Sequence, residues 1–565
     1  GPCRTRRSDL GGFRRTARFP SFTVLFAVET ARPKSRTASL PAEGLGGARP
    51  TGGSQPPRLA RWAPLVLLAL VAVVALPIVR QTLDLGDEGF MAHCAERVLH
   101  GQLPHRDFYS LQGPLSAMLM AGWSAVAGLS FLKLRVAGVL IHAAMVLLTY
   151  AIARRFAGAP WAFGAAAVAV LVGLPHMHFA PLAIWQGLML SLLSVWLAVR
   201  SLRAVHGVLA FASGAVAALS MLVRHDQGFY MALSIAALAI ALRFVPASRL
   251  APGPRFRLGN WLLGATAVAL PALLFFWTQG ALPAMWDQLV LFPLTRYSAT
   301  SAIPMPSLGQ EGPAGSLLAF VVFRITPLAV SATLGLVVWR ARRKGYGEGE
   351  ALGLFLAAWS MLMYAQVLVR SDLPHLVITL HPTLVLLAWL PGYAMRALGL
   401  EGDRHARGRS LIAAGSAACF AALAIVAWHM LLPPLERDLQ PLRAERAGLL
   451  ERASEADVID ATVRTIQERT GPTEAVLVLP YQPAYYVLSQ RRNPTQWGYH
   501  WPGDRTNAEL AQMVSQLQQD PPALAVVFHR DSTATYLGPV VQWLEAHYAP
   551  VDPAADPVIY TPREP

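Results

Sequence analysis

Apolar runs of roughly 17–22 residues recur along this chain between residues 62 and 431. As helices, runs of that length match the thickness of the hydrocarbon core of a bilayer. Only 14% of the residues are charged and 54% are hydrophobic, and a soluble chain of 565 residues would not have this composition. The sequence therefore predicts a helical protein that crosses a membrane many times.

The basic residues between the apolar runs predict how the helices are oriented. The expected spans are residues 62–79, 134–153, 159–175, 181–199, 205–222, 229–247, 259–278, 316–339, 351–369, 376–394 and 410–431. With these eleven spans, the gaps rich in Arg and Lys all fall on the side of the N-terminus, which the positive-inside rule makes cytoplasmic. We expect a multi-pass protein of the bacterial inner membrane whose C-terminal part is extracytoplasmic.

One further apolar stretch, Leu115–Leu132, is left out of the spans. Counting it would place Arg154 and Arg155 on the outer side and invert every later loop. It is also only about 18 residues long, which is near the lower limit for crossing a bilayer. We expect an interfacial or re-entrant helix within an outer loop that covers residues 80–133.

The first 61 residues differ in composition from the spans. They are basic and rich in Gly, Pro and Ser, and they show no helical apolar period, so they predict a disordered leader. The first methionine of the chain is Met91, and we expect the leader to be partly a mis-called start or the edge of a fragment. The formal net charge of +15 does not indicate nucleic-acid binding, because Arg and Lys gather in the gaps between spans, where they orient helices.

Residues 433–565 predict a small extracytoplasmic α/β domain. A charged helical stretch at 436–470 precedes two strand-like runs, GPTEAVLVLP (471–480) and PALAVVFH (522–529), and the helical pattern NAELAQMVSQLQQ separates the two runs. Alternation of this kind is typical of a layered α/β fold. Three tyrosines and one basic segment have two interpretations: they either face the membrane site or are loop and core residues. They are Tyr481, Tyr485, Tyr486 and residues 491–496.

Several common chemistries have no matching motif in the sequence. The three cysteines, Cys3, Cys94 and Cys419, fall in three different parts of the chain, so we expect no disulfide framework. The chain has no P-loop, no HExxH and no G-x-G-x-x-G between a strand and a helix. These absences argue against an ATP-driven pump, a zinc protease and a nucleotide-binding Rossmann domain. We also expect no bound metal and no cofactor, because no clear set of metal ligands is present.

An acidic pair, Asp87-Glu88, lies a few residues beyond the first expected span. Ionisable groups at a membrane boundary are costly and usually have a function, although a solvated acidic turn is an equally simple interpretation. Other outer loops combine acids with Arg, His or Tyr: Arg106 and Asp107; Arg224, His225 and Asp226; Arg296 and Tyr297; Arg370, Asp372 and His375.

Arginine is depleted on the outer side by the positive-inside rule, so its presence in these loops needs a reason. A guanidinium matches phosphate oxygens in a bidentate fork, which makes an anion site one explanation. An ion pair that closes a helix hairpin, as between Arg370 and Asp372, is the structural alternative.

The segment after the first span carries a family resemblance. Asp87 and Glu88 lead into AHCAERVLHGQLPHRDF, Gly-Pro-Leu at 113–115 opens the interfacial stretch, and LRVAGVLIHAAMVLLTYAIARRF forms the next span. With these elements the chain resembles the membrane-embedded C-type glycosyltransferases, and more narrowly the branch of protein mannosyltransferases, aminoarabinose transferases and rhizobial lipopolysaccharide transferase-like proteins. The match covers residues 62–245, and the later helices match by topology. The chain departs from the aminoarabinose branch at Gln112-Gly113-Pro114, where that branch has a basic residue and two prolines.

The resemblance implies a fold and a reaction. The fold would be an all-α polytopic membrane domain of about 11 helices with the small α/β domain attached. The reaction would transfer a hexose or pentose from a polyprenyl-phosphate-linked donor to a glycan, lipid or protein acceptor on the extracytoplasmic face, with inversion. The resemblance makes Asp87 the base and Glu88 its support. Charge and location, not the resemblance, suggest that Arg224, Arg370 and Arg106 contact the phosphate, with their loop neighbours as further substrate contacts.

Two other functions fit the same pattern. A transporter or flippase for a lipid-linked glycan would show pseudo-repeated halves and charges at the membrane midplane. No internal repeat is evident and the ionisable residues gather at one face, with Arg324 inside an expected span as the exception. A non-catalytic envelope-assembly protein is the other alternative.

Overall fold

A computed structural model describes residues 58–202, 204, 206–249, 256–310, 312, 316–400 and 405–563. The expected disordered leader therefore lies outside the described residues up to residue 57, and the first helix begins at Arg58. The long helices are α1 (Arg58–Ile78), α4 (Phe131–Phe156), α5 (Ala159–Leu171), α6 (Ala183–Ser201), α7 (Val208–Val223), α8 (His225–Arg243), α9 (Leu258–Thr278), α13 (Ile325–Lys344), α14 (Glu348–Val369), α16 (Leu380–Ala397) and α17 (Ala406–Leu431). Each of them occupies one of the expected spans, so the membrane-protein fold class is confirmed.

The number of membrane crossings depends on the length and composition of each helix. Within the described residues, eight helical segments are long and apolar enough to cross a membrane. Helix α7 is apolar but only 16 residues long. The total of eleven spans, and the side on which each terminus lies, stay predictions.

Small and hydroxylated residues let these helices approach closely. A Cβ on Gly214 of α7 would lie 1.8 Å from the carbonyl oxygen of Trp261 in α9. Between α6 and α7, Ser191 and Ser220 form a buried hydrogen bond of 2.9 Å. Apolar burial gives little drive for association inside a bilayer, so close packing and such polar contacts hold the bundle together.

The span expected at 316–339 is interrupted. Helix α12 (Leu317–Val322) ends one turn before α13, and Arg324 lies at the break. Its guanidinium donates to the carbonyl oxygens of Pro306 (3.0 Å) and Phe320 (2.9 Å) and lies over the Phe320 ring. Backbone carbonyl groups at a helix end therefore accept the hydrogen bonds of Arg324. The sequence had indicated instead that Arg324 lies inside one continuous span.

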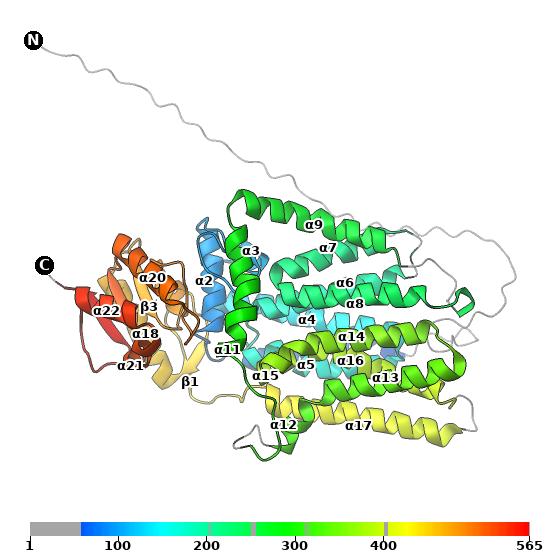
Figure 1. Ribbon diagram of the computed structural model, residues 1–565. Coiled ribbons are helices and arrows are strands. Elements are labelled where there is room, and N and C mark those ends of the chain that lie inside the picture. Colours follow the sequence, from blue (N-terminus) through cyan, green and yellow to red (C-terminus); the bar gives the residue numbers. More distant parts are fainter. Residues whose placement is uncertain are drawn as a thin grey trace, which may run out of the picture. The chain divides into compact units, whose positions relative to one another are not determined.

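Shorter elements gather at the end of the bundle that carries the acidic pair (Figure 1). They are α2 (Asp87–Leu99), α3 (Pro114–Ala127), the 3-10 turn Leu174–Met177, α10 (Leu282–Trp286), two π-helical turns (Asp287–Leu291 and Pro293–Tyr297), α11 (Ser298–Thr300) and α15 (Leu373–Val377). Helix α3 has 14 residues and stops at Gly128, whose φ of 87° ends the helix. It is too short to cross a bilayer, as expected for this stretch.

The C-terminal α/β region contains two sheets. Its elements are β1 (Leu439–Pro441), β2 (Leu450–Arg452), α18 (Ala453–Arg469), β3 (Val476–Leu479), α19 (Ala484–Ser489), α20 (Asn507–Gln519), β4 (Leu524–Val527), α21 (Arg530–Tyr536), α22 (Gly538–His547), β5 (Tyr548–Pro550) and β6 (Val558–Pro562). A four-stranded sheet has the order β3-β4-β6-β5, with β3 and β4 parallel and the other pairs antiparallel. The two predicted strands are present. The predicted helix at 436–470 is wrong for its first half, which forms the antiparallel β1–β2 pair.

The C-terminal α/β region packs directly on the segment that carries the acidic pair. The backbone N–H of Leu450 donates to the carbonyl of Arg80 at 2.7 Å, and Thr82 returns a bond of 2.8 Å to Leu450. Farther along, Tyr109 donates to the carbonyl of Gln496 at 2.9 Å. This region therefore contributes side chains to the surroundings of α2.

Candidate functional site

Three carboxylates lie at the start of α2: those of Asp84, just before the helix, and of Asp87 and Glu88, in its first turn. Asp84 precedes the helix, and its Oδ1 accepts hydrogen bonds from the N–H groups of Gly86 (2.9 Å) and Asp87 (3.2 Å). These bonds satisfy backbone donors that a helix N-terminus leaves free, and the helix dipole favours negative charge there. We call these three residues the carboxylate cluster.

Glu88 is turned into the protein. Both of its oxygens accept from the Arg135 guanidinium, at 2.8 and 2.6 Å, and both side chains are fully buried. Arg135 lies on α4 and also donates to the carbonyl oxygens of Val79, Gln81 and Thr82. The pair fixes the α1–α2 connection against α4. A carboxylate held in this way has no oxygen available for a substrate.

Asp87, its sequence neighbour, faces solvent. The hydroxyl of Tyr481, from the C-terminal α/β region, donates to Asp87 Oδ1. Among the described residues, no group donates to Oδ2. The approach requires Gly86, because a Cβ there would lie 2.2 Å from the Tyr481 ring. Asp87 is thus the member of the acidic pair that has a free oxygen at the surface.

Asp84 is chemically distinct from an ordinary surface aspartate. The surrounding protein displaces water from its carboxyl group, and Asp87 and Glu88 add negative charge nearby. Together these effects raise the pKa of Asp84 from 3.8 to about 6. The carboxylate cluster therefore changes its charge within a mildly acidic range.

Arg224 and Asp226 form an ion pair at the start of α8. The Arg224 Nε and Nη2 donate to the two oxygens of Asp226 at 2.9 and 3.2 Å, and both side chains are about one-fifth exposed (23% and 20%). Asp226 also accepts from the backbone of Gln227. Between them, His225 has a buried Nδ1 that lacks a hydrogen-bond partner in the described structure.

A second Arg-x-Asp pair precedes α15. Arg370 Nε donates to Asp372 Oδ2 at 2.5 Å, while Asp372 Oδ1 accepts from both the backbone N–H (3.0 Å) and the Nδ1 (2.6 Å) of His375. Burial alone would raise the pKa of Asp372, but the bonds from His375 and Arg370 hold that pKa well below its usual range. Asp372 is therefore ionised and orients both of its neighbours.

Tyr297 joins the two pairs. Its hydroxyl lies 3.5 Å from His375 Nε2. Burial raises the pKa of Tyr297, and the positive charges of Arg370 and Arg224 act in the opposite direction. We call Arg224, Asp226, Tyr297, Arg370, Asp372 and His375 the arginine cluster. These residues come from three segments distant in sequence, 224–226, 297 and 370–375, and the sequence alone could not bring them together.

Arg296, Arg106 and Asp107 lie elsewhere. Arg296 donates to Glu509 at 2.8 Å and ties the π-helical segment to the C-terminal α/β region. Arg106 is exposed and pairs with its neighbour Asp107 at 2.8 Å and with Gln279 at 2.7 Å. These contacts give both arginines a positioning role and do not add them to the arginine cluster.

Aromatic side chains run between the two clusters. The Tyr481 ring meets Tyr499 at 5.3 Å between centroids. Tyr109 contacts Phe292 at 6.3 Å, and Phe292 contacts Tyr297 at 6.4 Å. Arg505 connects the two sets of rings, because its guanidinium lies 4.2 Å from the Tyr109 ring centroid and donates to the carbonyl of Tyr499 at 3.3 Å.

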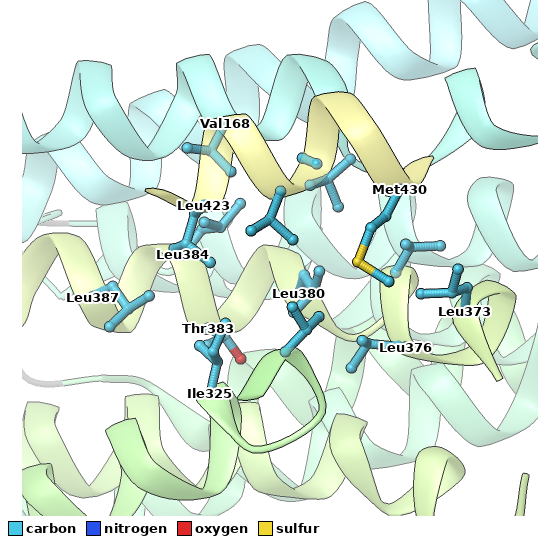
Figure 2. Close-up of a pocket in the computed structure, with 15 residues that line it drawn as sticks. Val168, Ile325, Leu373, Leu376, Leu380, Thr383, Leu384, Leu387, Leu423 and Met430 are labelled. Atoms are coloured by element: carbon cyan, nitrogen blue, oxygen red, sulfur yellow. The ribbon is translucent and has the colours of Figure 1, made fainter. Parts of the chain in front are cut away.

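A small apolar pocket lies beside the arginine cluster (Figure 2). Its lining includes Leu373 and Leu376 of α15, which follow Asp372 directly, together with Ile325, Leu380 and Met430. The space inside this pocket is about 30 Å³, which is close to the volume of one water molecule. Its apolar lining continues directly from Asp372 along α15.

Two residues of this site, Asp84 and Arg135, escaped the sequence analysis. Of the three tyrosines with two interpretations, Tyr481 contacts Asp87. An arginine within an apolar span is unusual, so Arg135 carried a signal, but its partner was set by the fold. Tyr485 and Tyr486 proved to be core residues, with 0% and 1% exposure. The described residues contain no group of three His, Cys, Asp or Glu that could hold a metal ion.

Known structures share this architecture. ArnT from Cupriavidus metallidurans, solved with undecaprenyl phosphate bound, matches with a TM-score of 0.53 and 14% identity over 88% of this chain and 97% of that one. The Archaeoglobus fulgidus oligosaccharyltransferase, tethered to an acceptor peptide that contains the NVT sequon, matches with a TM-score of 0.51 and 12% identity over 90% of this chain and 74% of that one. No family model and no curated protein sequence matches. The chain has the fold of the C-type glycosyltransferases, which confirms the expected resemblance.

Proposed function

We propose that this protein is a membrane glycosyltransferase that moves a sugar from a polyprenyl-phosphate-linked donor to an acceptor hydroxyl or amide. The observation that carries the proposal is that the two residues of the acidic pair have different surroundings. Glu88 is buried against Arg135, while Asp87 has a free carboxylate oxygen at the surface. The acceptor is a glycolipid, a polysaccharide or a protein, and the sugar is a hexose or pentose.

In the proposed reaction, Asp87 Oδ2 takes the proton of the acceptor group as that group attacks the anomeric carbon of the donor. The bond from this carbon to the phosphate oxygen breaks, and the configuration inverts. The phosphate stays on the lipid and carries the negative charge that the broken bond leaves. Arg224 and Arg370, each fixed by its own aspartate, stabilise that charge.

The apolar side chains that follow Asp372 on α15 support the lipid part of this proposal. A phosphate near Arg370 would place the first isoprene units of its lipid against Leu373 and Leu376. ArnT has been solved with undecaprenyl phosphate, and the archaeal transferase with an acceptor peptide, so lipid-phosphate and peptide ligands are known for this fold.

We further propose that the chain is a multi-pass protein of the bacterial inner membrane with a cytoplasmic N-terminus. The carboxylate cluster, the arginine cluster and the C-terminal α/β region would then lie on the extracytoplasmic side. A reporter that is active only in the periplasm, fused after residue 565, should give signal. Signal from a cytoplasmic reporter instead would place the site on the opposite side of the membrane.

The reaction itself is tested with purified protein in nanodiscs and undecaprenyl-phosphate sugar labelled in the sugar. A membrane extract supplies the acceptors. If the protein transfers the sugar, the label should leave the donor lipid and appear in a glycan, acceptor-lipid or protein fraction, and undecaprenyl phosphate should be released. In liposomes, label that stays on the lipid but moves between leaflets would favour the flippase function, and label that does neither would favour an assembly role.

A further inference from the structure

The side chains around Tyr481 form an aromatic cluster that the proposed chemistry leaves without a role. Its members are Phe90, Tyr481, Tyr499 and Trp501, which meet edge to face at centroid distances of 4.6 Å (Phe90–Tyr499), 5.3 Å (Tyr481–Tyr499) and 5.3 Å (Tyr481–Trp501). Trp501 keeps 41% of its surface exposed, whereas the nearby Trp497 keeps 2%. The cluster therefore presents one indole to solvent on a base of packed rings.

The loop that carries Trp501 is held in place by its neighbours. The backbone of His500 donates to the carbonyl of Pro480 at 2.7 Å, and Asp504 donates to the carbonyl of Trp501 at 3.0 Å. The Asp504 carbonyl in turn accepts from Arg296 at 3.5 Å. An aromatic surface fixed before binding loses little conformational entropy when a ligand covers it.

The position of Trp501 relative to the base is set by Tyr481. The Tyr481 hydroxyl bonds to Asp87, and the same ring packs against Trp501. Trp501 is therefore separated from the Asp87 carboxylate by one tyrosine side chain.

We propose that Trp501 is an acceptor subsite that stacks a pyranose ring, and that the acceptor is a carbohydrate. The inference rests on the proposed function, because it takes Asp87 as the point where the acceptor reacts. The apolar face of a sugar ring packs on the indole as other flat apolar groups do. Its outer hydroxyls donate to Asp87, which is exposed.

Charge and shape favour a carbohydrate over other occupants. The carboxylate cluster repels an acceptor that carries phosphate near its reacting end, but it accepts hydrogen bonds from neutral hydroxyls. Trp and Tyr also anchor proteins at membrane interfaces, so lipid headgroups are the competing occupant of an exposed indole. The two occupants place Trp501 in different surroundings, which an experiment can separate.

The binding test uses the full chain in detergent on an array of bacterial surface glycans. We expect wild type to bind a subset of the glycans. Trp501→Ala should weaken that binding about tenfold or more, and Trp501→Phe should retain part of it. The matched control is Trp428→Ala, because Trp428 is also exposed (57%) but lies on α17 of the bundle. Equal binding by Trp501→Ala and wild type, or no glycan binding by wild type, would overturn the proposal.

A fluorescence test distinguishes glycan from lipid. The emission of a single tryptophan is the difference between wild type and the variant that lacks it. In nanodiscs that contain brominated phosphatidylcholine, the emission of Trp428, obtained with Trp428→Phe, should be quenched by the lipid. The emission of Trp501, obtained with Trp501→Phe, should not be quenched by the lipid, and a bound glycan should shield it from aqueous acrylamide. Quenching of Trp501 by the brominated lipid would make it a membrane anchor and contradict the subsite.

Transfer kinetics separate this inference from the proposed function. Trp501→Ala should raise the acceptor KM about tenfold and leave the donor KM unchanged. Asp87→Asn should abolish transfer but bind the same glycans as wild type. Transfer that survives in Asp87→Asn counts against the proposed base alone, whereas an unchanged acceptor KM in Trp501→Ala counts against the subsite alone.

Discussion

The carboxylate cluster and the arginine cluster pair their charges over different distances in sequence. In the arginine cluster, Arg224 and Arg370 each bind an aspartate two residues later. In the carboxylate cluster, Glu88 binds Arg135 on another helix, 47 residues away. The local pairs hold their arginines at the site, whereas the distant pair removes one carboxylate from the site and leaves Asp87 exposed. Adjacent residues in the sequence can therefore have opposite roles.

The first prediction tests the free member of the acidic pair. Asp87→Asn keeps the size of the side chain but cannot take a proton from the acceptor. Loss of a general base typically reduces rates by roughly 10²–10⁴-fold, about 3–5 kcal/mol of barrier. We expect that loss in transfer per monodisperse molecule, with an unchanged melting temperature. More than about a tenth of wild-type activity would rule out the base assignment.

The second prediction tests the buried member. Glu88→Leu leaves the Arg135 guanidinium buried without its counter-ion, which typically costs about 3–5 kcal/mol of stability. We expect poor expression and a much lower melting temperature in detergent. The double variant Glu88→Leu/Arg135→Met should recover much of that stability, because no isolated charge remains. A Glu88→Leu protein as stable as wild type but inactive would instead give Glu88 a direct catalytic role.

The third prediction addresses the arginine cluster. Arg224→Ala and Arg370→Ala should each slow transfer by about 2–4 kcal/mol of barrier, because each removes a charged donor from the leaving phosphate. The effect should appear in the use of the donor and not in acceptor affinity. Arg296→Ala is the matched control, since Arg296 binds Glu509 outside this cluster. Donor kinetics that change equally in all three variants would make the arginines structural.

A fourth, smaller effect is expected at Tyr481. Tyr481→Phe removes the hydroxyl that holds Asp87 and keeps the ring that packs on Trp501. A hydrogen bond to a charged group contributes about 1.5–3 kcal/mol, so we expect kcat to fall about tenfold. The donor KM and the melting temperature should stay unchanged. A fall in melting temperature with normal kcat would show that Tyr481 only attaches the C-terminal α/β region.

The smallest predicted effect is a pH dependence at Asp84. Its pKa of about 6 in the folded protein exceeds the ordinary 3.8, so the folded state holds this proton more tightly than the unfolded chain. The stabilisation is fully present below about pH 4 and is lost as the pH rises through about 6. The melting temperature of wild type should therefore fall as the pH rises from about 4 to about 6, and Asp84→Asn should not show this contribution to the fall. Parallel melting curves for the two proteins would contradict the shift.

The sequence predicted the helices better than the contacts between them. Apolar runs placed each long helix to within a few residues, because a bilayer-length run has no other stable way to satisfy its backbone. The same reasoning extended the helix at 436–470 too far, since it overlooked Pro441 and the positive φ of Gly448. The break at Arg324 also depended on backbone partners that only the folded chain provides.

By itself, the sequence determined the class of the protein, the positions of its long helices and the presence of Asp87 and the two Arg-x-Asp pairs at helix ends. These follow from local composition and spacing, which act through the periodicity of one helix. The tertiary structure decided which carboxylate stays exposed, because Arg135 and Tyr481 reach the acidic pair from two distant segments and Gly86 leaves room for the Tyr481 ring. Burial and ion pairing depend on which surfaces meet, and that information lies in the packing of distant segments.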